Sequence, residues 1–257
     1  MNDLLKPLHL KYVEKHLPNL LEQARLHSLT YEAFLRRVLT LEIEARHLAA
    51  SQNREKAAKL PVRKTLEEFD FSFQPALSSR LLWELAELSF LKTHTNIVFL
   101  GPPGVGKTHL AVSLSVKALE AGYSVLFTTL ADLALDLAAA PHPSLVSKRL
   151  RRYLLPRLLI IDEIGYTKLE ESQSNALFEL VRDRYERGST ILTSNTSFSE
   201  WGHLLGNEVL AAALLDRLLH HAEVISIPGK SFRMRDRSAA AKGKNASAKS
   251  DGETGGL

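Results

Sequence analysis

The pattern of apolar positions divides the chain into a helical first part and a second part in which strands alternate with helices. Up to about residue 60, apolar side chains recur at the spacing of one helix face, and no glycine occurs before Gly101. We therefore predict a small N-terminal all-α domain over residues 1–64, followed by an α/β domain over residues 65–237. The helical rows are Leu17, Leu20, Leu21 and Ala24, then Phe34, Val38, Leu41, Ala45 and Leu48.

Short apolar runs in the second part predict five strands with helices between them. The run Leu158–Ile161 is apolar at every position, which is typical of a strand buried on both faces of a parallel sheet. We expect a parallel five-stranded sheet flanked by helices. The expected strands are 97–100, 124–128, 158–163, 189–193 and 223–227, and the expected helices are 78–91, 109–119, 130–140, 172–187 and 207–221.

The last part of the chain, residues 238–257, is rich in Ala, Lys, Ser and Gly and has almost no large apolar side chains. Such a segment buries too little apolar surface to offset the entropy lost on ordering. We predict that it is a disordered tail.

Composition narrows the function classes. The chain has 257 residues, of which 45% are hydrophobic, enough for one large domain and a small one. It has no cysteine, which excludes disulfides, thiolate metal sites and a cysteine nucleophile. Residues 1–7 lack the apolar core of a signal peptide, and no segment approaches eighteen uninterrupted apolar residues. We therefore expect a cytoplasmic protein without a membrane segment.

Positive charge is concentrated in local segments. The formal net charge is +4 and the sequence pI is about 9.2, which permits a nucleic-acid partner without requiring one. In residues 46–64 a solvated helix face and a phosphate- or partner-docking module remain equal alternatives. Residues 144–157 carry five cations and no acid, so we favour contact with the DNA backbone there. The expected DNA-binding residues are Lys148, Arg149, Arg151 and Arg152.

A glycine-rich turn lies between the strand expected at 97–100 and the helix that follows. The segment Gly101–Thr108 has a glycine, four further residues and then Gly-Lys-Thr, the pattern of a phosphate-binding loop. Its backbone N–H groups and the helix N-terminus are suited to phosphates. Lys107 is expected to reach the terminal phosphates of ATP, and the Thr108 hydroxyl to hold Mg²⁺. The predicted nucleotide contacts are Gly101, Pro102, Gly104, Val105, Gly106, Lys107, Thr108 and His109, together with Asp162.

Two acidic residues end the run Leu158–Ile161. Ligands of open α/β sheets bind at the carboxyl ends of the strands, which is where Asp162 and Glu163 are expected to lie. We assign Asp162 to Mg²⁺ together with Thr108, and Glu163 to the polarisation of a water molecule. Asn195, at the tip of the next expected strand, is a candidate to orient that water, although Asn is also common in turns.

These motifs, in this order, resemble those of an AAA+ ATPase. A closer resemblance is to the IstB-like ATP-binding proteins, the helper ATPases of insertion sequences, through Lys64–Phe71 and Gly104–Ala111. The resemblance covers about residues 5–237. It implies an AAA+ P-loop NTPase fold in a bacterial, nucleoid-associated protein. The DnaC-type helicase loaders share most of this core.

The resemblance implies a regulator of transposition. Such proteins bind ATP, form homo-oligomers on double-stranded DNA, deform it, and recruit and stimulate a partner transposase. Arg217 resembles the arginine finger that reaches a neighbouring subunit's ATP, and Arg233 resembles the second sensor arginine. Only about thirty residues follow Ile227, so a full helical lid is not expected, and Arg235 or Arg237 could replace Arg233.

Two other functions compete with the transposition helper. One is a DnaC-like helicase loader that acts in replication, and nothing inside the chain separates it from the helper. The other is a nucleotide-independent DNA-binding module with an inactive ATPase core. The presence of Lys107, Thr108, Asp162 and Glu163 argues against that module.

Overall fold

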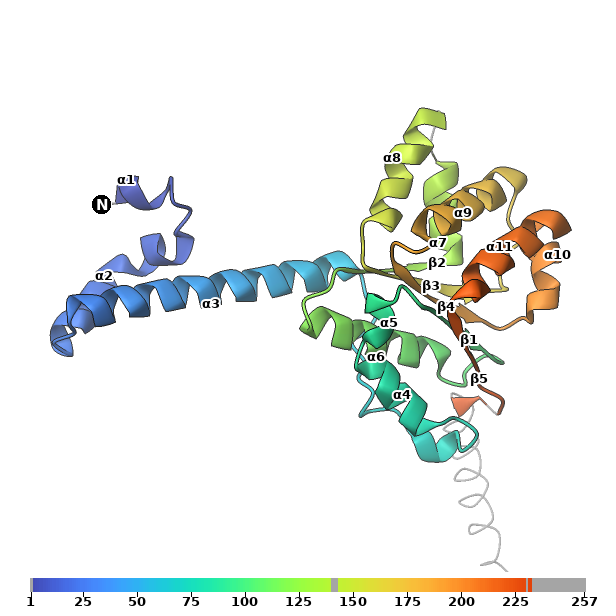
Figure 1. Cartoon of the computed structure of the whole chain (residues 1–257), viewed down its shortest axis with the longest axis horizontal. Coiled ribbons are helices and arrows are strands. Elements are labelled where there is room, and N and C mark those ends of the chain that lie inside the picture. Colours follow the sequence, from blue (N-terminus) through green and yellow to red (C-terminus); the bar gives the residue numbers. More distant parts are fainter. Residues whose placement is uncertain (1, 140–142, 230, 233–257) are drawn as a thin grey trace, which may run out of the picture. The chain divides into compact units, whose positions relative to one another are not determined.

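The computed structural model describes residues 2–139, 143–229 and 231–232, and its chain divides into two compact units (Figure 1). The first unit comprises residues 1–56 and the second residues 57–257. We describe each unit by itself. The predicted tail at 238–257 lies outside the described residues, as do Arg233, Arg235 and Arg237.

The N-terminal unit is built from helices α1 (Asn2–Leu5), α2 (Lys11–Leu26) and most of α3 (Tyr31–Ala58). Its small core comprises Val13, Leu20 and Val38. Glu42 is buried and accepts hydrogen bonds from the backbone N–H groups of Tyr12 and Val13, at 2.9 and 3.0 Å. Burial alone would raise the pKa of Glu42, but these bonds and Arg46 hold it below its ordinary value.

The second unit contains one parallel sheet, and this confirms the predicted α/β fold. Its strand order is β2-β3-β4-β1-β5, and every neighbouring pair is parallel. Carboxyl ends of all five strands therefore lie at one edge. The strands are β1 (Asn96–Leu100), β2 (Val125–Thr129), β3 (Leu158–Ile164), β4 (Ser189–Ser194) and β5 (Ala222–Ser226).

Both faces of the sheet are covered by helices (Figure 1). On β1 the side chains alternate, so that Ile97 and Phe99 join one buried cluster and Val98 joins the other. The first face is covered by α4 (Ser79–Ala86), α5 (Ser89–Lys92) and α6 (Lys107–Glu120). The second is covered by α7 (Leu130–Ala138), α8 (Pro143–Leu154), α9 (Glu171–Arg184), α10 (Trp201–Leu205) and α11 (Glu208–His220).

The helix expected over 78–91 is broken in the structure. Helix α4 ends at Ala86, Leu88 has a left-handed backbone with φ 63°, and α5 begins at Ser89. In one continuous helix, Phe90 would lie about 140° around the axis from Leu85, away from the core. The break brings Phe90 into the same buried cluster as Leu85 and Leu88, and burial of a large aromatic side chain offsets the strained backbone.

A buried arginine near the end of α9 connects this helix to the end of α8 and to the start of β4. Arg184 is 4% exposed, and its guanidinium donates to the carbonyl oxygens of Tyr153, Pro156 and Ser189 at 2.6–2.9 Å. Burial, and then the charge of Arg157, lowers the pKa of Arg184 to about 10. In the part of the chain that the structure describes, no helix is long and apolar enough to cross a bilayer.

Candidate functional site

The predicted phosphate-binding loop joins β1 to α6, and two segments that are distant in sequence pack against its glycines. Gly106 has φ 104°, and a Cβ there would lie 2.5 Å from the ring of Phe69. Gly104 has φ 82°, and a Cβ there would lie 2.1 Å from the hydroxyl of Ser231. Neither the backbone nor the surrounding space accepts a side chain at these positions, which leaves glycine as the residue that fits.

Lys107 is the first residue of α6, and its side chain turns back over the loop. Its ammonium donates to the carbonyl oxygens of Gly101 at 2.6 Å and Pro102 at 2.8 Å. The amides at the start of this 14-residue helix have no partners within the helix, and the helix dipole adds positive potential there. The loop therefore offers an ammonium and a set of N–H groups, which together suit a polyphosphate.

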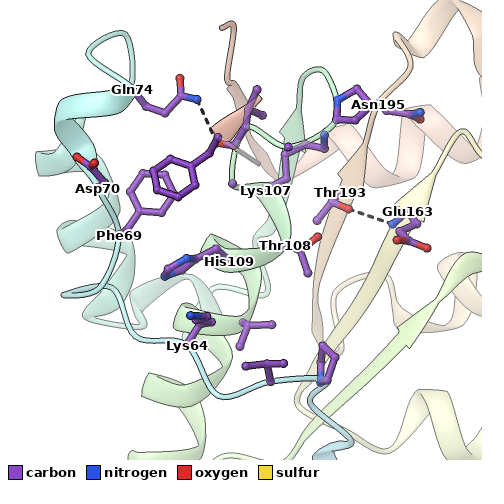
Figure 2. Close-up of a pocket in the computed structure, with 18 of the residues that line it drawn as sticks. Lys64, Phe69, Asp70, Gln74, Lys107, Thr108, His109, Glu163, Thr193 and Asn195 are labelled. Carbon is purple, nitrogen blue, oxygen red and sulfur yellow. Dashed lines mark hydrogen bonds between the residues drawn. The ribbon is translucent and has the colours of Figure 1, made fainter. Parts of the chain in front are cut away.

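A buried carboxylate and two threonine hydroxyls form a connected set beside Lys107. Asp162 is 3% exposed and accepts from the Thr108 hydroxyl, with both of its oxygens 3.0 Å from Oγ1. It also accepts a short hydrogen bond from Thr193. Glu163 donates its backbone N–H to the Thr193 hydroxyl at 3.1 Å, while its own side chain is exposed (Figure 2). The structure thus brings the two predicted acids to the loop.

Asn195 follows β4 and lines the same cavity as Lys107 and Glu163. Its Oδ1 is buried and has no hydrogen-bond partner among the described residues. A Cβ on Gly165 would lie 2.0 Å from this oxygen, which shows how closely these two segments of the chain approach each other. An unpaired buried polar atom is costly unless a ligand or water satisfies it, so this position suits a residue that contacts a bound molecule.

The cavity of about 540 Å³ continues outward from the loop. Its outer wall comes from residues 61–74 and from Phe232. The rings of Phe73 and Phe232 meet edge to face at 5.0 Å, and His109 lies 2.9 Å from the Thr65 carbonyl oxygen. Figure 2 shows Phe69, Gln74 and His109 on one side of Lys107 and Thr193, Glu163 and Asn195 on the other. This shape suits a molecule with a flat apolar part and an anionic part.

Sequence reasoning did not identify several of these residues. The sequence of Thr65–Phe71 indicated a family resemblance and no role for Phe69 at this site, whereas in the structure Phe69 covers Gly106 and lines the cavity. The dense aromatic spacing at 69–73 was an available signal for this wall. Thr193 was noted only as part of a strand tip, and its contact with Asp162 had no signal in the sequence because the two lie on different strands.

Arg217 lies on α11 and does not line the cavity beside the phosphate loop. Its guanidinium lies 4.9 Å from the centre of the Phe178 ring. It helps to line a second cavity with Tyr185, Asp216 and His220. Arg217 is thus not among the residues that line the cavity beside the loop of the same chain.

Two arginines of the basic helix α8 form ion pairs with an acid on the neighbouring helix α7. Asp136 on α7 pairs with Arg149 at 3.4 Å and Arg152 at 3.6 Å. Residues 144–157 contain no acid, but α7 packs beside α8 and supplies one to this pair, so Arg149 and Arg152 are not without a counter-ion. Lys148 and Arg151 are exposed. Of the four predicted DNA contacts, these two are the ones without an acid partner in the structure's described residues.

Comparison with known proteins places these motifs in context. A family model described as IstB-like ATP binding protein matches residues 3–240. The chain is 43% identical over 251 residues to a Pseudomonas aeruginosa protein named for insertion sequence IS21 and ATP binding, covering 97% of this chain and 95% of that protein. It is 44% identical over 230 residues to a Geobacillus stearothermophilus protein named likewise for IS5376, covering 90% and 92%.

A solved structure with a similar fold is that of the DnaC helicase loader. The TM-score is 0.52 and the sequence identity is 23%, with 63% of this chain and 96% of that chain covered. At this identity the likeness concerns the fold alone.

Proposed function

This chain belongs to the family of IstB-like ATP binding proteins, and on that premise we propose that it is an ATP-hydrolysing, DNA-binding helper of transposition. The names of its relatives support ATP binding and an insertion-sequence context. The proposal of ATP hydrolysis is supported by the hydrogen-bonded set of Thr108, Asp162 and Thr193, beside which Glu163 is exposed to the same cavity.

The residues around the loop fit Mg²⁺ and a nucleoside triphosphate. Hydroxyl and carboxylate oxygens are the ligands that Mg²⁺ prefers, and one or two protein ligands are usual, so Thr108 and Asp162 would hold it. The ion supplies neutralisation of charge on the phosphate oxygens. Lys107 binds the terminal phosphates, Asn195 orients the attacking water, and Glu163 accepts its proton. The aromatic residues of the outer wall bind the adenine base of ATP.

Arg217 completes the site of a neighbouring subunit in this proposal. Its position in a separate cavity, beside Phe178, supports action across an interface rather than within its own chain. A cation supplied in trans stabilises the charge that develops on the phosphoryl group. It also makes assembly depend on the bound nucleotide, so ATP would control a homo-oligomer on DNA. Arg233 stays a proposal for a second sensor of nucleotide.

A mixing experiment tests the shared site. Lys107→Ala and Arg217→Ala variants should each be inactive in ATP hydrolysis, while Arg217→Ala still binds ATP. Mixed in equal amounts with duplex DNA, they should recover a substantial fraction of the activity, because some interfaces combine an intact Lys107 with an intact Arg217. No recovery, or normal turnover by Arg217→Ala alone, would contradict a role in trans.

Helix α8 is the proposed contact with DNA. Lys148 and Arg151 are exposed, whereas Arg149 and Arg152 also interact with Asp136. Backbone contacts of this kind carry little sequence information, so we propose recognition of DNA shape and deformation of the duplex. Imaging of the protein on duplex DNA, with and without a non-hydrolysable ATP analogue, tests assembly and bending together.

A helicase loader is the second candidate, favoured by the fold shared with the DnaC helicase loader. The two functions differ in their protein partner. The purified transposase of the same insertion sequence and a replicative helicase can be offered in parallel to the ATP-bound protein. We expect the transposase to bind; binding of the helicase alone would favour the loader.

A further inference from the structure

The pairing of β3 with β4 shifts register at the two acids, so that one residue of β4 lies opposite both of them. Ile161 pairs with Leu192 and Ile164 pairs with Ser194, so Asp162 and Glu163 together face Thr193. Glu163 takes a left-handed backbone, with φ 64°. A β-bulge of this kind redirects a side chain that would otherwise point to the opposite face of the strand from its neighbour.

The hydrogen bonds across the bulge have only one possible direction. A backbone N–H can only donate and a carboxylate can only accept, so the Thr193 hydroxyl accepts from Glu163 N–H and gives its single proton to Asp162. Thr193 is 1% exposed, which shields both bonds from water. The Thr108 hydroxyl also donates to Asp162, from the side of the phosphate loop. One strand hydroxyl thus touches both acids.

We propose that Thr193 is a positioning residue that holds Asp162 and Glu163 in register for phosphoryl chemistry. This inference rests on the proposed ATPase function. Thr193 replaces the ladder partner that the Glu163 N–H loses at the bulge, and so stabilises a left-handed backbone conformation that is unfavourable for a non-glycine residue. Through the same hydroxyl it orients the carboxylate that, with Thr108, would hold Mg²⁺. Its methyl group has no part in either task.

Three variants separate this role from simple packing. Thr193→Val keeps the shape but loses the hydroxyl, and should lower kcat by about tenfold or more while nucleotide affinity changes little. Thr193→Ser restores the hydroxyl and should keep kcat within about threefold of the original protein. Thr190→Val is the control, because it removes another buried hydroxyl of β4, one bound to Arg184 at 3.1 Å instead of to the acids. It should lower stability and leave kcat unchanged.

A second readout does not depend on hydrolysis. Hydrogen exchange at the Glu163 amide should become at least about tenfold faster in Thr193→Val than in Thr193→Ser, because the valine provides no acceptor. Equal kcat in Thr193→Val and the original protein, or equal losses in the Val and Ser variants, would overturn the proposal. Unchanged exchange at Glu163 would do so as well. If the original protein hydrolyses no ATP, the proposed function fails, and the exchange measurement still decides whether Thr193 holds the bulge.

Discussion

The inner and outer halves of the cavity are built in different ways. The inner half consists of the loop, Lys107, Thr108 and the two acids, joined by hydrogen bonds of 2.6–3.1 Å and by the short bond between Thr193 and Asp162. The outer half consists of residues 61–74 and Phe232, where aromatic contacts such as the pair of Phe73 and Phe232 are combined with single hydrogen bonds to the loop, such as that from Gln74 to the Val105 carbonyl oxygen at 3.3 Å. A connected set of hydrogen bonds therefore places the inner groups, whereas the outer wall depends on packing of aromatic rings together with a few bonds to the loop and α6.

The two halves meet at the loop glycines. Phe69 of the outer wall lies where a side chain on Gly106 would be, and the Phe232 N–H donates to the Gly104 carbonyl oxygen at 2.9 Å. Binding of a nucleotide to the loop is therefore expected to affect both outer segments. Substitutions in the inner half should remove function, and those in the outer half should weaken it.

Lys107→Ala should have the largest effect on binding. It removes the one Lys or Arg side chain of Gly101–Thr108, and leaves a desolvated polyphosphate without this partner. We expect a loss of about 2–5 kcal/mol in ATP binding, or about 30-fold to several thousand-fold in Kd, measured by titration with a fluorescent ATP analogue. Unfolding temperature should barely change, and undiminished affinity would remove this loop from the nucleotide site.

Gly106→Ala should have an intermediate effect and tests the contact between the halves. The new Cβ meets both an unfavourable φ of 104° and the Phe69 ring. Gly122→Ala is a matched control, since it has φ 89° and nothing within 4 Å of its Cβ. We expect about 1–2 kcal/mol of destabilisation in the control and a larger loss in Gly106→Ala.

Denaturant unfolding measures both, and ATP affinity should fall in Gly106→Ala alone. A double variant with Phe69→Leu should recover part of the difference, because a smaller, flexible side chain relieves the overlap but not the backbone strain. Equal destabilisation at Gly106 and Gly122 would show that the two halves of the cavity are not coupled through Phe69.

Phe232→Ala should have the smallest effect. It removes one ring of an edge-to-face pair that is worth about 0.5–1.5 kcal/mol, so ATP affinity should fall only about two- to tenfold. The rate of hydrolysis at saturating ATP should remain unchanged, because the inner half is intact. Tyr31→Ala, an exposed aromatic of the N-terminal unit, serves as the control. A loss of kcat in Phe232→Ala would contradict the division between the halves.

Almost all residues of the inner half could be predicted from the sequence. Loop, helix start and acid pair each occupy consecutive residues, so local patterns report them directly, and the parallel sheet followed from apolar runs such as Leu158–Ile161. The break between α4 and α5 at Leu88 could not be predicted, because it depends on how Phe90 packs in the core. Likewise, the pairing of Asp136 with Arg149 and the position of Phe69 over Gly106 depend on contacts between segments far apart in the chain.

We propose that the acids beside the phosphate loop take part in the hydrolysis of ATP, and Glu163→Gln is the decisive variant. The variant keeps the side chain's size and exposure but cannot accept a proton from water. With Mg²⁺ and duplex DNA present, we predict ATP affinity within about twofold of the original protein and turnover lower by about 100-fold or more. Turnover equal to that of the original protein would show that Glu163 does not accept the proton, and no ATP hydrolysis by the original protein itself would show that the cavity is not an ATPase site.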